Sequence, residues 1–174
     1  TEALNMQRAM TVMGLNYGDV DNDGWLDIYN GTGTPNYTSL VPKVMFRNNA
    51  GKAYQDVTTA GGFGHVQKGH GIGFGDVDND GDQDVYEDMG GGYEGDGFQG
   101  AFYENPGTPG NNWVTLQLVG TKANKAAIGS KVKITIEEAG TTRDIYHVVS
   151  NGGSFGVNSI RLEAGLGKAT AIKQ

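Results

Sequence analysis

The sequence predicts an all-β protein. Three observations support this: apolar and polar residues alternate along several segments, glycine makes up 30 of 174 residues, and helical periodicity is nearly absent. Only residues 1–10 and 122–127 are candidates for helices, and both segments are short. Four prolines and the lack of a Gly-X-Y period exclude collagen and polyproline structures. We therefore expect short strands joined by many tight turns.

The first part of the chain repeats itself at an offset of 57 residues. Residues 14–29 align with 71–86 without a gap, and ten of the sixteen positions are identical. The same offset brings residues 45–48 onto 102–105. In each unit we expect an alternating strand, an Asp-rich turn, a second short strand, a variable connection and a third strand.

The charge of the chain changes sign along its length. Residues 1–110 hold 16 Asp and Glu against 5 Lys and Arg, a net charge of −11, and residues 111–174 hold 4 against 8, a net charge of +4, which together give −7. Turn residues fill 105–112, where the change occurs. We therefore predict two repeats, at about 11–60 and 68–110, followed by a second domain at 111–174.

The second domain is predicted to be a small antiparallel β domain. Apolar and polar side chains alternate at residues 114–118 and 131–136, which is typical of half-buried strands. Residues 138–141 have the composition of a hairpin turn, and a further strand is expected at 143–150.

Two acidic loops, at residues 19–27 and 76–84, carry the pattern D-x-D-x-D-G-x-x-D. Calcium takes six to eight oxygen ligands at about 2.3–2.6 Å. Carboxylates at positions 1, 3, 5 and 9 can converge because the glycine at position 6 permits a tight turn, and position 7 offers its backbone carbonyl. We therefore predict two Ca²⁺ sites, with Trp25 and Asp82 binding through their carbonyls. The predicted ligands are Asp19, Asp21, Asp23, Trp25, Asp27, Asp76, Asp78, Asp80, Asp82 and Asp84.

A solvated acidic turn is the simplest alternative to a metal site. It would hold four carboxylates together without a cation, and each like-charge pair at 4 Å costs about 4 kcal/mol at an effective dielectric constant of 20. Magnesium fits less well, because it keeps several waters in a small octahedron. An EF-hand sensor is a third alternative, since Glu87 falls at position 12 of the second loop. Strands flank both loops instead of helices, so we expect Glu87 at the surface.

Composition excludes several classes of function. A sequence pI near 4.8 argues against binding to nucleic acid or anionic lipid. No apolar run reaches the roughly 18 residues of a membrane-spanning helix. The absence of cysteine excludes disulfides and thiolate metal sites but is compatible with secretion. Asn36 begins an N-x-[ST] glycosylation sequon, which matters only in a eukaryotic secretory route.

Signals for an enzyme are weak. Residues 152–156 match the G-x-S-x-G nucleophile pattern around Ser154, but no His follows and no helix is expected there. His65, His70 and His147 are too few and too scattered to predict a zinc site. Carboxylates that hold a cation stay ionised and make poor general acids. We therefore predict a protein that is not an enzyme.

The repeated unit resembles the calcium-binding FG-GAP, or VCBS, repeats of integrin α-subunit propellers and of bacterial surface proteins. The residues that carry the resemblance are 18–24 with Asp27, 75–81 with Asp84, and 45–49 with 102–105. This resemblance implies propeller blades with calcium loops on one face.

The tail resembles the ASPIC/UnbV domain, which follows such repeats in relatives of cartilage acidic protein. The matching segments are 112–132 and 152–167. Relatives continue into a last strand, so the resemblance implies that this domain is truncated after Gln174. It also implies an extracellular, cell-surface or periplasmic protein.

These observations favour a calcium-binding, non-catalytic module for adhesion or recognition, with a protein or glycan ligand at the cell surface. Exposed sheet edges would allow homo-oligomers to form. The alternative is an accessory carbohydrate-binding module of a secreted polysaccharide-active enzyme. In that case Trp25, Tyr93 or Trp113, which we expect to be exposed, would serve as sugar platforms.

Overall fold

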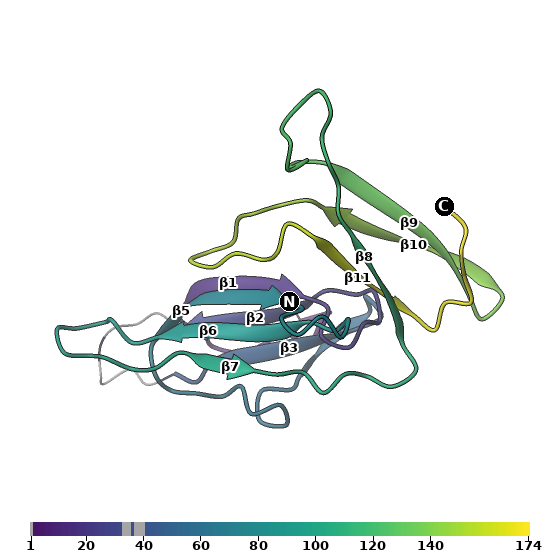
Figure 1. The fold of residues 1–174 in the computed structure, drawn as a ribbon. Coiled ribbons are helices and arrows are strands. Elements are labelled where there is room, and N and C mark those ends of the chain that lie inside the picture. Colours follow the sequence, from purple (N-terminus) through teal and green to yellow (C-terminus); the bar gives the residue numbers. More distant parts are fainter. Residues whose placement is uncertain (1, 33–35, 37–40) are drawn as a thin grey trace.

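The computed structural model describes residues 2–32, 36 and 41–174, and its regular structure is entirely β (Figure 1). Tyr37 and Thr38 of the sequon lie outside the described residues. No described segment, including 2–10 and 122–127, forms an α-helix. None of the described residues forms a helix long and apolar enough to cross a membrane. The all-β prediction is thus confirmed.

Within the described residues, twelve strands form four antiparallel sheets, with the orders β1-β2-β3-β4, β5-β6-β7, β10-β9-β12 and β11-β8. The strands are β1 (Val12–Gly18), β2 (Asp27–Thr32), β3 (Val44–Asn49), β4 (Ala53–Asp56), β5 (Gly69–Gly75), β6 (Asp84–Met89), β7 (Ala101–Tyr103), β8 (Asn112–Leu116), β9 (Lys131–Glu138), β10 (Thr141–Val148), β11 (Leu162–Gly167) and β12 (Ala171–Ile172).

The first two sheets pack against each other and contain the two copies of the repeat (Figure 1). Their shared core holds Tyr29 and Met45 from the first sheet and Ile72, Phe74 and Val85 from the second, all buried. Because side chains alternate between the two faces of a strand, these residues all point into the space between the sheets. Each acidic loop joins the first two strands of its sheet, so both loops lie at the same end of this packed pair.

The remaining strands make a second core. Ile134, Ile136 and Ile145 of β9 and β10 pack with Ala164 and Leu166 of β11. The β9–β10 hairpin turns at residues 139–140, where Ala139 and Gly140 both have positive φ, as the sequence predicts for this position.

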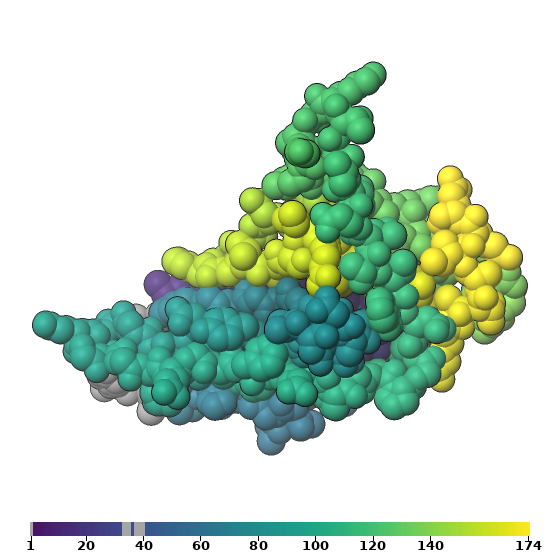
Figure 2. Space-filling model, in the orientation of Figure 1, coloured from purple at the N-terminus to yellow at the C-terminus, as the bar shows by residue number. Residues whose placement is uncertain are grey.

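The segment 154–158, between β10 and β11, lies along the first two sheets. In Figure 2 this segment, coloured yellow-green, rests on the lower layer. Asn158 Nδ2 donates to the carbonyl of Tyr17 at 2.8 Å, and its Oδ1 accepts from Asn16 Nδ2 at 2.7 Å and from the Phe74 amide at 3.0 Å. Ser154 Oγ donates to the Met13 carbonyl. The segment therefore joins β1 to β5, and no helix follows Ser154 as a nucleophile elbow requires.

The prediction that Glu87 lies at the surface is wrong. Its side chain is 0% exposed and lies between the first two sheets. Glu87 Oε1 forms an ion pair with Lys43 Nζ at 3.3 Å, and the Lys43 side chain is equally inaccessible. Tyr29 OH donates to Glu87 Oε2 at 2.9 Å. Burial lowers the pKa of Lys43 and raises that of Glu87, so the pair depends on both partners.

Candidate metal centre

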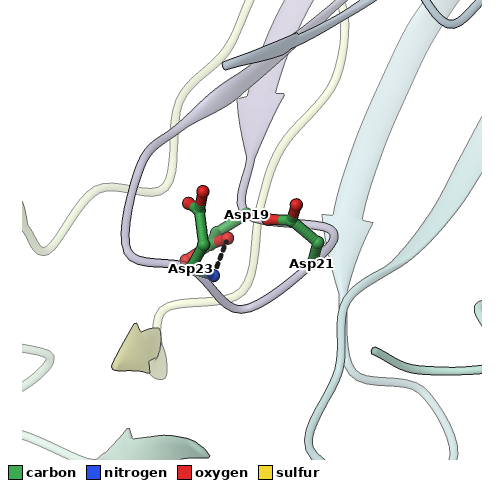
Figure 3. A group of neighbouring side chains, drawn as sticks. All are labelled: Asp19, Asp21 and Asp23. Atoms are coloured by element: carbon green, nitrogen blue, oxygen red, sulfur yellow. Dashed lines mark hydrogen bonds between the residues drawn. The ribbon is translucent and has the colours of Figure 1, made fainter. Parts of the chain in front are cut away.

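The first loop brings three carboxylates together. Asp19, Asp21 and Asp23 each offer an oxygen, and these oxygens lie within 4.8 Å of one another (Figure 3). Positive φ angles at Asn22 (56°) and Gly24 (84°) curl the chain around them. Asp19 holds this turn because its carboxylate accepts from the amides of Asp23 at 3.0 Å and Gly24 at 2.8 Å.

The second loop repeats this arrangement. Asp76, Asp78 and Asp80 form an equivalent group within 4.8 Å. Asn79 and Gly81 have positive φ, at 64° and 99°. The loops differ in their surroundings, because Asp19 and Asp21 are buried whereas Asp78 and Asp80 are exposed. The first loop is therefore the more desolvated of the two.

Asp27 and Asp84, at position 9, tie the first loop to β3 and the second loop to the residues that follow β7. Asp27 accepts from the amides of Val20 at 3.0 Å and Asn48 at 2.7 Å. Asp84 makes the corresponding bonds to the amides of Val77 and Asn105, at 3.1 and 2.9 Å. The close groups of carboxylates contain only the first three acids of each loop. Ligation by Asp27 and Asp84 therefore stays a prediction.

Position 7 is occupied by Trp25 and Asp82. The structure shows no hydrogen bond to either backbone carbonyl among the residues it describes, which leaves both oxygens available to an ion. Trp25 is half-buried, with its ring against Gly51 and the Arg143 guanidinium 5.6 Å from its centre. Of the three proposed sugar platforms, Tyr93 and Trp113 are exposed and Trp25 is not.

Burial makes the ionised loop costly without a cation. It raises the pKa of Asp19 to about 8, and the neighbouring charges of Asp27, Asp23 and Asp21 add to the rise. Burial likewise raises the pKa of Asp27 to about 7, and Asp21 and Asp23 act in the same direction. A bound cation would reverse this balance by stabilising the carboxylates.

The donor set fits a hard cation. Asp21 is 7% exposed, and its Oδ1 is buried with no hydrogen-bond partner among the described residues. Its Oδ2 accepts from Arg47 Nε at 2.5 Å, so only one oxygen is neutralised by the chain itself. An unsatisfied buried carboxylate oxygen is costly unless a ligand completes it. Because every candidate donor is an oxygen, the residues present fit calcium.

The C-terminal strands support both loops from outside. Arg143 Nη2 donates to the Asp23 carbonyl at 2.9 Å, and Arg161 Nη2 donates to the Asp76 carbonyl at 3.2 Å. Glu163 Oε2 accepts from the Asp76 amide at 3.1 Å. Gly165 lies so close to the first loop that a Cβ there would be 2.1 Å from Asp19 Oδ2. No pattern in the sequence indicates these contacts, because they join residues 85 or more positions apart.

The two loops also contact each other. Asn22 Nδ2 donates to the Gly81 carbonyl at 3.0 Å. Gln83 Oε1 accepts from the Asp19 amide at 2.7 Å, and its Nε2 donates to Glu163. Gln83 therefore joins the first loop, the second repeat and β11. In the repeat alignment it faces Leu26, so nothing marked it as a linking residue.

Family comparisons identify both parts of this arrangement. The FG-GAP-like repeat model matches residues 19–87, which include both loops, and the ASPIC and UnbV model matches residues 120–174. The chain carries an FG-GAP-like repeat followed by an ASPIC/UnbV domain. The resemblance seen in the sequence is thereby confirmed. No curated protein matches the chain. The contacts that Arg143, Arg161, Glu163 and Gly165 make with the loops are therefore contacts between the FG-GAP-like repeat and the ASPIC/UnbV domain.

Proposed function

We propose that this protein is a calcium-binding, non-catalytic module for recognition or adhesion outside the cell or at its surface. The observation that carries the proposal is the pair of loops in which three carboxylates converge. The buried and unpartnered Oδ1 of Asp21 supports a cation in the first loop. Two ions would be bound by the ten residues predicted from the sequence, five in each loop.

Calcium is favoured over magnesium by the number of oxygens near each loop. Three carboxylates and a free carbonyl at position 7 approach the six to eight oxygens that calcium takes, with waters completing the shell. In the first loop, the positive charge of the ion would offset the repulsion between the buried carboxylates. Its structural effect would be to hold the loops in the geometry that the ASPIC/UnbV domain contacts.

The location and partner of the module are inferred from the kind of domain. FG-GAP-like repeats are typical of extracellular and cell-surface proteins. A pocket of about 410 Å³ beside the first loop, lined in part by Val20, Asp21, Arg47, Phe63 and Tyr103, offers a recognition surface for a protein or glycan ligand. The division into repeats at about 11–60 and 68–110 and a domain at 111–174, with the two sheets as propeller blades, is part of this proposal.

Thermal unfolding with calcium and with chelator tests the metal sites. Calcium at about 100 times its dissociation constant adds roughly 2.7 kcal/mol per site, if the unfolded chain does not bind it. We expect a higher melting temperature in calcium, and we expect Asp21→Asn combined with Asp78→Asn to abolish the difference.

Asp88→Asn is the matched control, because it removes one negative charge from an exposed position of β6 outside the loops. It should leave the calcium effect intact. Calorimetric titration should give two ions per chain. The same melting temperature in calcium and in chelator would contradict the proposal.

A further inference from the structure

A second pocket lies between the two loops. It has a volume of about 270 Å³ and is lined by Asn22 of the first loop, Asp80 and Asp82 of the second, the connection 106–111, and Trp113. We call it the Asp82 pocket. None of the described residues that line it is Lys, Arg or His, so this lining supplies carboxylates and no positive charge.

The carboxylate of Asp82 is the unexplained group in this pocket. Asp82 is 6% exposed, and its Oδ1 has no hydrogen-bond partner among the described residues. The proposed metal site would use only the backbone carbonyl of Asp82, so the loop does not need an acid here, and the first repeat has Trp25 at the same position. Gly107 makes room for this carboxylate, because a Cβ there would lie 2.5 Å from Asp82 Oδ2. The surroundings therefore accommodate a charge that the chain leaves unpaired.

Trp113 adds an aromatic wall. It is 44% exposed, and its ring lies directly against Gly81, where a Cβ would come within 1.7 Å of a ring atom. Gly81 sits between the two acids of the pocket in the sequence. Aromatic faces attract organic cations, and tryptophan does so most strongly. Because the proposed calcium site takes the Asp80 side chain, Asp82 is the acid left for a further ligand, and its carboxylate beside an exposed indole makes a site for a flat or tetrahedral organic cation.

We propose that the Asp82 pocket binds the cationic side chain of a protein partner, with a guanidinium preferred. This inference rests on the recognition role proposed above and names the chemistry of the ligand. The volume lies just below the roughly 300–1,000 Å³ of pockets for drug-sized ligands, which suits a single side chain. A planar guanidinium can donate two parallel bonds to a carboxylate and stack on the indole.

The test uses tryptophan fluorescence and calorimetry in saturating calcium. The chain has two tryptophans, so Trp25→Phe leaves Trp113 as the reporter. The probes are N-acetyl-argininamide, N-acetyl-lysinamide and the neutral isostere N-acetyl-citrullinamide, with free arginine to separate a peptide-like ligand from the free amino acid. Calorimetry on the unsubstituted chain guards against any effect of the Trp25 change.

We expect saturable binding of N-acetyl-argininamide that is at least about tenfold weaker for Asp82→Asn, because a charged hydrogen-bonding partner is lost. Asp88→Asn, which makes the same charge change at an exposed site, should bind as the parent does. Equal affinity for the arginine and citrulline probes, or no effect of Asp82→Asn, would overturn the proposal. So would tighter binding of free arginine than of N-acetyl-argininamide.

Calcium in the pocket is the main competing outcome. If Asp82 binds an ion through its side chain, Asp82→Asn lowers the calcium stoichiometry and excess calcium displaces the arginine probe, and either result overturns the proposal. The same titrations separate this inference from the calcium proposal. If the chain binds two calcium ions but not the arginine probe, only the pocket proposal is contradicted. If it binds the probe but no calcium, only the calcium proposal is contradicted.

Discussion

The buried ion pair of Lys43 and Glu87 gives the sharpest test of the fold. Glu87→Gln keeps an oxygen that can accept from Tyr29 and removes the charge that faces Lys43. At the observed 3.3 Å, two unit charges attract by about 5 kcal/mol at an effective dielectric constant of 20. Removing one partner of a buried pair typically costs about 3–5 kcal/mol, because the other charge stays buried and uncompensated. We expect a loss of that size in the free energy of unfolding.

Urea unfolding at neutral pH, followed by tryptophan fluorescence, measures this loss. Lys43→Met combined with Glu87→Gln should recover most of it, because no charge is then left buried. The exposed neighbour Asp88→Asn controls for the change in net charge and should shift stability by less than about 0.5 kcal/mol. A loss below about 1 kcal/mol for Glu87→Gln, or a double variant no more stable than the single one, would refute the buried pair.

Three further predictions concern the contacts around the loops and strands. Gly165→Ala should destabilise the chain by about 1–3 kcal/mol and weaken calcium binding, because the new methyl group overlaps Asp19. Gly75→Ala, which has open space around it, should cause a much smaller loss of stability in the same thermal unfolding experiments. Asn158→Ala should speed hydrogen exchange of the β5 amides, and unchanged exchange would contradict its bridging role. Burial lowers the pKa of His147, so the unfolded chain binds the proton more readily and stability should fall as pH drops below about 6.5; a pH profile unaltered in His147→Gln would count against this.

The sequence was most informative where structure is local. The 57-residue repeat places both loops, and alternation places the strands on either side of them, because each signal lies within a few residues of the element it predicts. The sequence did not predict β4 (Ala53–Asp56), a short strand of half-buried and exposed residues with no apolar alternation. Its partner β3 supplies the hydrogen bonds that define it.

Glu87 was misplaced for a related reason. In β6 it follows Val85 and precedes Met89 at intervals of two, so alternation puts all three on the inward face. The prediction of a surface position rested on the charge of Glu87. Lys43, the partner that makes its burial tolerable, is 44 residues away in the sequence. Patterns within a strand cannot reveal a partner that lies elsewhere in the chain. The contacts of Arg143 and Arg161 with the loops escaped prediction in the same way.

The attachment of Asn158 to β1 and β5 has a consequence for how the chain acquires its structure. Its bond to Asn16 joins residues 142 positions apart. Contacts of such sequence separation form late, because a long loop must close before they contribute. During synthesis, the residues of the first two sheets would emerge from the ribosome well before residue 158, and the two sheets would lack this hydrogen bond until then. We expect slow folding, and early strands that associate with other chains when the C-terminal segment is delayed or removed.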